Sequence, residues 1–169
     1  MMNKRRSFII GIKSYKLSSR EKKFLKLYKP WGVILFSRNI KSIKQCSILT
    51  NSIRDIFKDK FYPILIDEEG GKVSRLSKII NTSVFKAQFF GDLFLSNKTK
   101  FNTYSKVYIE QMSYLLKQMG ININTVPVLD VRRTKSNKII GSRSFSTKPK
   151  IVSKIGDIFI NLYQKNNIG

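Results

Sequence analysis

Three acidic residues and two glycines follow a short apolar run in the middle of the chain. Asp67, Glu68 and Glu69 come directly after the run at residues 62–66, and Gly70-Gly71 close the segment. A buried strand of a parallel sheet has this continuous apolar pattern, and such sheets bind ligands beyond the carboxyl ends of their strands. A carboxylate there is placed to accept hydrogen bonds from substrate hydroxyls, and the glycines let the backbone turn sharply. An acidic surface turn would give the same triplet.

Polar side chains also follow two other apolar runs. A Ser-Arg-Asn segment at residues 37–39 follows one run, and Asp130 follows another at 121–128, which leads into a loop that carries Arg143. Asp130 also suits a loop-start carboxylate bonded to nearby backbone N–H groups. In a chain with 33 basic residues, Arg75 and Arg143 also suit a solvated surface.

The elements that must position these residues alternate along the chain. Apolar runs predict strands over 7–12, 31–36, 62–66 and 121–128, and helical spacing predicts helices over 20–29, 43–58, about 85–95, 99–119 and 149–164. This order predicts an α/β protein with βαβ units and a parallel sheet. An open doubly wound sheet and part of a (β/α)₈ barrel both fit. The absence of a G-x-G-x-x-G or P-loop pattern weakens the nucleotide-binding version.

The second helix of this series has a clear beginning and a clear apolar face. Ser42 and Gln45 have the spacing of a capping box. Cys46 lies on the apolar face with Leu49 and Ile53, so we expect a buried, inert thiol. With one cysteine and no histidine, the sequence excludes an internal disulfide, a histidine zinc site and a Ser-His-Asp triad. We therefore expect no metal and no cofactor.

The charge of the chain is strongly positive. Lys and Arg number 33 against 10 Asp and Glu, for a net charge of +23. Nucleic-acid binding is one interpretation. Compositional drift is the other and the one we favour, because 24 of the 33 basic residues are lysine, lysines are spread along the whole chain and isoleucine occurs 23 times. We expect no specific nucleic acid. We also expect no membrane association, because no apolar run approaches the roughly 18 residues of a membrane span. We expect no secretory signal, because Lys13 ends the apolar stretch at residues 8–12 too early for one.

Four motifs occur in an order that resembles a known family. They are Gly-Val-Ile-Leu-Phe-Ser-Arg-Asn at 32–39, Ile-Asp-Glu-Glu-Gly-Gly-Lys-Val-Ser-Arg at 66–75, Asn-Ile-Asn-Thr-Val-Pro-Val-Leu-Asp-Val at 122–131 and Ile-Gly-Ser-Arg-Ser-Phe at 140–145. Together they resemble the N-terminal part of the bacterial β-N-acetylhexosaminidases of glycoside hydrolase family 3. The resemblance covers the chain from about residue 8 to its end.

The resemblance implies a fold, a reaction and a set of site residues. The implied fold is a (β/α)₈ TIM-type barrel. The implied reaction is retaining hydrolysis of terminal β-linked N-acetylglucosamine, typically from muropeptides during cytoplasmic peptidoglycan recycling. By motif position, Asp67, Arg75 and Arg143 are implied to bind the sugar, and Asp130 to line or support the site. Carboxylates and guanidinium forks can fix a pyranose through several directional hydrogen bonds.

Departures from the family pattern shape the functional expectation. Lys72 stands where arginine is usual. The family continues into a Lys-His-Phe-Pro-Gly-His-Gly motif, an Asp-His acid/base pair and an Asp nucleophile, none of which occurs here. We therefore expect residues 1–169 to be the N-terminal portion of a barrel domain, incomplete at its C-terminus, with no catalytic residue and no activity of its own. A complementary C-terminal fragment is the expected protein partner. The alternatives are a non-catalytic sugar-binding remnant and, less favoured, a basic nucleic-acid-binding protein.

Overall fold

Strands and helices alternate along most of the chain. The computed structural model describes residues 5–133 and 139–169. In chain order the elements are β1 (Arg6–Gly11), α1 (Ser19–Tyr28), β2 (Pro30–Leu35), the short 3-10 helix η1 (Ser37–Asn39), α2 (Ile43–Phe57), β3 (Ile64–Ile66), α3 (Ala87–Ser96), α4 (Lys98–Gln118), β4 (Ile123–Asn124), η2 (Gly141–Arg143) and α5 (Pro149–Lys165). The predicted α/β class, with parallel strands alternating with helices, is confirmed.

The strands form one sheet in the order β1-β2-β3-β4, and every neighbouring pair is parallel. The register places Gly11, Ile34, Leu65 and Ile123 side by side across the sheet. Because side chains alternate along a strand, these residues share one face. The other face contributes strand residues to the hydrophobic core, namely Val33, Leu35, Ile64 and Ile66. Asp67 has the parity of Leu65, which places it on the face opposite the core, at the carboxyl end of β3.

The first two helices, α1 and α2, begin directly after the serines that the sequence predicts as their caps. Ser18 and Glu21 form a complete capping box at the start of α1. At the start of α2, the Ser42 hydroxyl accepts from the Gln45 amide as expected, but the Gln45 side chain accepts from the Lys41 amide instead. The capping box predicted for α2 is therefore only half formed. The side-chain nitrogen of Gln45, Nε2, instead donates to the backbone carbonyls of Tyr15 and Asn39. No helix in the described parts of the chain is long and apolar enough to cross a bilayer.

The strand predicted over 121–128 is wrong in its length. The ladder of β4 is formed by Ile123 and Asn124, and on either side of them the Asn122 and Thr125 amides donate to the Ile64 and Ile66 carbonyls of β3. The Val126 amide then turns back to the Asn124 carbonyl, and residue 127 is a proline, which has no N–H to donate. The chain therefore leaves the sheet early and places the loop after β4 above its edge. β3 is likewise shorter than predicted and starts after Pro63.

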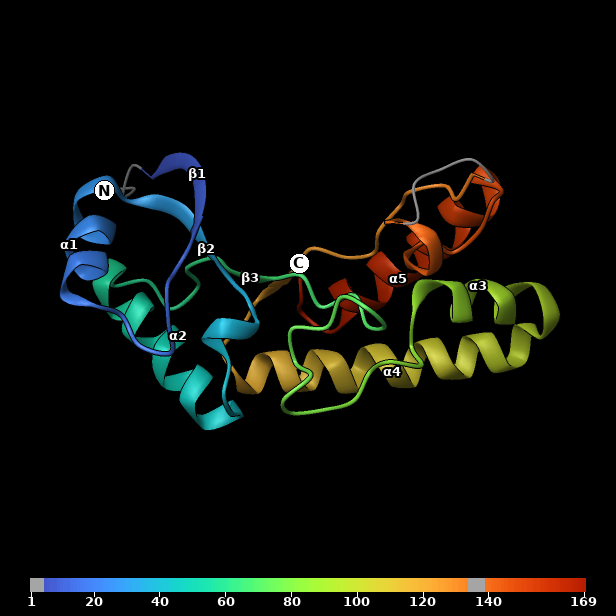
Figure 1. Ribbon diagram of the computed structural model, residues 1–169, viewed down its shortest axis with the longest axis horizontal. Coiled ribbons are helices and arrows are strands. Elements are labelled where there is room, and N and C mark those ends of the chain that lie inside the picture. The colour runs from blue at the N-terminus through green and yellow to red at the C-terminus, as the bar shows by residue number, and fades with distance from the viewer. Residues whose placement is uncertain (1–4, 134–138) are drawn as a thin grey trace.

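Helix packing covers the core side of the sheet and extends beyond it. Figure 1 shows α3 folded back along α4 as a hairpin, with α5 beside them and α1 and α2 near β1 and β2. Cys46 is fully buried on the apolar face of α2, as predicted. The last residue, Gly169, exchanges two backbone hydrogen bonds with Asn122 and Asn124, so it pairs with the outer edge of β4.

Candidate functional site

Asp67 is the most exposed of the three acids at the end of β3, and it forms a polar cluster with two other side chains. Its Oδ2 lies 3.2 Å from Nη2 of Arg75, and its Oδ1 accepts from the Thr125 hydroxyl. The Asp67 and Arg75 side chains are 29% and 27% exposed, so solvent reaches both. The buried Nε of Arg75 has no hydrogen-bond partner among the described residues. The guanidinium also lies over the Phe36 ring, 5.4 Å from its centroid, which fixes its plane.

Glu68 has a structural role that its type and position do not reveal. The residue is 1% exposed. Its Oε2 accepts from the backbone amides of Arg75 and Leu76 at 2.6 and 3.0 Å, and its Oε1 accepts from the Thr82 hydroxyl at 3.2 Å. Buried carboxylates need such partners to offset the cost of leaving water. Glu68 therefore holds together the loop that presents Arg75.

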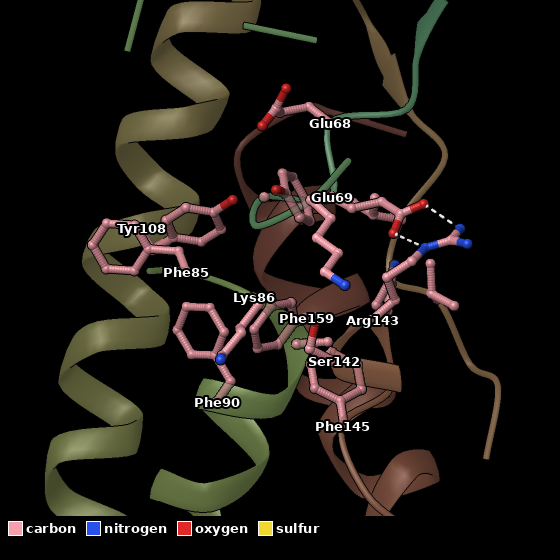
Figure 2. A pocket seen from close by; sticks show the side chains of 17 residues that line it. Glu68, Glu69, Phe85, Lys86, Phe90, Tyr108, Ser142, Arg143, Phe145 and Phe159 are labelled. Atoms are coloured by element: carbon pink, nitrogen blue, oxygen red, sulfur yellow. Dashed lines mark hydrogen bonds and ion pairs between the residues drawn. The ribbon is translucent and has the colours of Figure 1, made fainter. Parts of the chain in front are cut away.

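Glu69 forms a two-point ion pair with Arg143. Nε and Nη2 of Arg143 lie 2.8 and 2.7 Å from the two carboxylate oxygens, and Figure 2 shows this pair at the edge of a pocket. The hydrogen bonds that Arg143 donates to Glu69 raise the pKa of Arg143 against the effect of partial burial, and the charges of Glu69, Asp130 and Asp67 raise it further. Arg143 is thus joined to the loop after β3 although it lies 74 positions further along the chain.

Two residues of the β4 segment attach it to the loop after β3. The Asn124 side chain accepts from the Glu68 amide and donates to the Glu68 carbonyl, at 3.0 and 3.2 Å, and it also donates to the Tyr163 hydroxyl. Thr125 contacts Asp67 directly. Sequence reasoning missed both residues. The signal for Asn124 is the alternation of Ile and Asn over residues 121–124, and Thr125 follows that alternation directly.

Asp130 and the polar segment after β2 lie around this cluster in supporting positions. Asp130 is exposed, its carbonyl accepts from the Ser144 hydroxyl at 2.6 Å, and its charge acts on Arg143. Arg38 and the buried Asn39 both donate to the Ile12 carbonyl, so they join the end of β2 to the end of β1. Their observed contacts are therefore structural.

The four predicted residues meet at one edge of the sheet. Asp67 and Arg75 form one ion pair, Arg143 forms another with Glu69, and Asp130 acts electrostatically on Arg143. A narrow cavity of about 20 Å³ lies behind the Glu69–Arg143 pair. The arrangement offers half-exposed carboxylate acceptors and guanidinium donors, which suits a neutral polyhydroxyl ligand. Within 5–133 and 139–169, no group of three or more His, Cys, Asp or Glu is arranged to hold a metal ion.

Comparison with known proteins identifies relatives along nearly the whole chain. A β-hexosaminidase from Xanthomonas campestris pv. campestris is 27% identical over 161 residues, which is 95% of this chain and 47% of that protein. A β-hexosaminidase from Hydrogenovibrio crunogenus is 31% identical over 152 residues, covering 90% of this chain and 42% of that protein. The chain thus spans about half the length of these relatives.

A solved structure shares the fold closely. NagZ from Neisseria gonorrhoeae, crystallised in complex with N-trifluoroacetyl-D-glucosamine, superposes with a TM-score of 0.84 at 25% identity, over 96% of this chain and 48% of that one. The predicted barrel architecture is therefore confirmed as the fold of this half. Residues 6–168 match the model of the glycosyl hydrolase family 3 N-terminal domain. The relatives named above are β-hexosaminidases, and the chain itself belongs to glycosyl hydrolase family 3.

Proposed function

We propose that this chain binds the terminal β-linked N-acetylglucosamine of a saccharide at the carboxyl edge of its parallel sheet. The observation that carries the proposal is the pair of Asp67 and Arg75, half-exposed and held by Thr125 and Glu68. Asp67 would accept from sugar hydroxyls, and the exposed part of the Arg75 guanidinium would donate to a ring substituent. Arg143 would supply further donors from the opposite side of the loop.

The residues named here would bind rather than cleave. Retaining hydrolysis requires an acid/base and a nucleophile, one on each side of the scissile bond. We assign neither role to any residue of this chain, so we propose that the 169-residue chain is inactive alone. A complementary chain that supplies the second half of the barrel would complete the site. The relatives, about twice as long as this chain, support that proposal.

The biological setting we propose is peptidoglycan recycling in the cytoplasm. The substrate would be a muropeptide-derived saccharide with a terminal N-acetylglucosamine. The support for the sugar is the ligand of the NagZ structure, which is a derivative of D-glucosamine with an acylated nitrogen. A sugar-binding remnant without any catalytic partner is the second candidate, and it uses the same residues.

Isothermal titration of N-acetylglucosamine tests the binding step. We expect saturable binding to the native chain. Asp67→Ala should lose at least about tenfold in affinity, since a charged hydrogen bond contributes about 1.5–3 kcal/mol. The control Asp92→Ala, on the exposed side of α3, should bind with native affinity. Binding should barely change between low and high salt, because the ligand is neutral. Tight, steeply salt-dependent binding of RNA or DNA without sugar binding would instead favour the nucleic-acid alternative.

A further inference from the structure

The hydroxyl of Tyr108 is buried without a partner. Tyr108 lies on α4 and is 9% exposed, and its Oη has no hydrogen-bond partner among the described residues. Burial raises the pKa of this phenol well above its ordinary value, and the nearby Tyr163 and Glu68 raise it further. The group is therefore a neutral O–H donor at any physiological pH. A buried hydroxyl that makes no hydrogen bond is costly, so its surroundings need an explanation.

The surroundings are a cavity with polar groups at its walls. Tyr108, Glu68, Phe85 and Tyr163 all line the narrow cavity behind the Glu69–Arg143 pair. Figure 2 shows the Tyr108 hydroxyl turned from α4 toward the loop that carries Glu68. The Phe85 carbonyl oxygen and Tyr108 Oη lie 2.6 and 2.9 Å from the point where a side chain on Gly70 would begin. One acceptor and one donor therefore converge beside Gly70, and Glu68 lines the same cavity.

The size and the hydrogen-bonding capacity of the cavity match one water molecule. Its volume is about 20 Å³, and one water needs roughly 10–15 Å³ together with two to four polar partners. Oε1 of Glu68 receives a single hydrogen bond, from Thr82, so it has capacity for a second. The Glu68 carboxylate and the Phe85 carbonyl are both acceptors, so they cannot bond to each other. A water molecule can donate to both of them and accept from Tyr108.

We propose that this cavity binds one ordered water, which accepts from Tyr108 Oη and donates to the Glu68 carboxylate and the Phe85 carbonyl. The water joins α4 to the loop after β3. Glu68 in turn holds the amides of Arg75 and Leu76, so Tyr108 stabilises the conformation in which Arg75 is presented. The site does not depend on any bound sugar, and its test is independent of sugar binding.

Thermal unfolding of Tyr108→Phe tests the proposal through the sign of its effect. If a water bridges the hydroxyl to Glu68, the variant loses a hydrogen bond of the network, and we expect its Tm to fall by about 3 °C. If the hydroxyl is unpaired, the variant removes an unsatisfied group, and its Tm rises or stays the same. Ser113→Ala is the matched control, since the Ser113 hydroxyl is also on α4, buried and without a partner among the described residues, but Ser113 does not line this cavity. Its Tm should not fall.

Two further measurements localise the effect. Amide hydrogen exchange at Arg75 and Leu76 should be faster in Tyr108→Phe and unchanged in Ser113→Ala. A high-resolution crystal structure of the native chain should show a single water within hydrogen-bonding distance of Tyr108 Oη and Glu68. An empty cavity in that structure, or a direct bond from Tyr108 to a protein acceptor, would overturn the proposal, as would a rise in the Tm of Tyr108→Phe.

Discussion

The Asn124 side chain attaches the loop after β3 to β4, and replacing it with alanine tests how much the position of the loop depends on it. Asn124 is 3% exposed and makes three hydrogen bonds, two to the backbone of Glu68 and one to Tyr163. Each is worth about 1 kcal/mol net, and the substitution also leaves the buried Glu68 amide without a partner. We therefore expect Asn124→Ala to lower the free energy of unfolding by about 3 kcal/mol, a large part of the roughly 5–15 kcal/mol typical of a domain.

Asn122 is a matched control two residues earlier on the same segment. Its side chain also makes three hydrogen bonds, to Phe61, Tyr62 and Ile64, at the opposite end of β3. Because Asn122 is only partly buried, water can replace some of these bonds. We expect Asn122→Ala to cost about 1–2 kcal/mol.

Urea unfolding with amide hydrogen exchange distinguishes the two asparagines. Both variants should shift the urea midpoint, while only Asn124→Ala should expose the Glu68 amide to fast exchange and weaken sugar binding. The reasoning is refuted if Asn124→Ala loses less than about 1 kcal/mol, since water would then replace the three bonds at no great cost. It is also refuted if both variants weaken sugar binding equally.

Three other predictions concern groups away from this loop. Burial raises the pKa of Cys46 to about 12, so Ellman's reagent at pH 8 should label the native thiol only as fast as the protein unfolds, and fast labelling would contradict the burial. The pKa of Glu21 lies below its ordinary value of 4.5: partial burial raises the pKa, but hydrogen bonds from Ser18 and the Lys13 amide outweigh that effect. The stabilisation by Glu21 is therefore present above pH 4.5 and lost as the pH falls through its folded pKa. The difference in Tm between the native chain and Glu21→Gln should shrink on acidification, and a constant difference would contradict this role of the Glu21 charge. Gly91→Ala would place a Cβ 1.7 Å from the Phe145 carbonyl oxygen and should cost about 3 kcal/mol in urea unfolding, whereas Gly156→Ala, whose Cβ would meet only the Leu129 side chain, should change stability by less than about 1 kcal/mol.

Much of the fold was predictable because local patterns and tertiary packing agree. The continuous apolar runs became parallel strands, and the serines before the first two helices became their caps. The end of β4 was not predictable from hydrophobicity, because Val126 and Val128 are as apolar as a strand requires. What ends the ladder is the loss of the donor at Pro127 and the turn of the Val126 amide toward Asn124.

The position of these polar residues at the edge of the sheet was predictable, but their pairing was not. The three acids after β3 have similar side chains, and the sequence does not tell which of them is buried. In the structure, Asp67 pairs with Arg75 and Glu69 pairs with Arg143. Glu68 instead accepts hydrogen bonds from the backbone of its own loop. These pairings depend on the path of the loop and on contacts over 74 positions, which no local pattern encodes.

The most direct test of the central claim is a ¹⁹F NMR titration of N-trifluoroacetyl-D-glucosamine with this chain. The account predicts that the fluorine signal shifts or broadens on adding the native chain, that N-acetylglucosamine reverses the change by competition, and that Asp67→Ala abolishes it while Asp92→Ala does not. A signal that stays unchanged in the presence of the folded native chain, or that changes equally with Asp67→Ala, would contradict sugar binding at the edge formed by Asp67, Arg75 and Arg143.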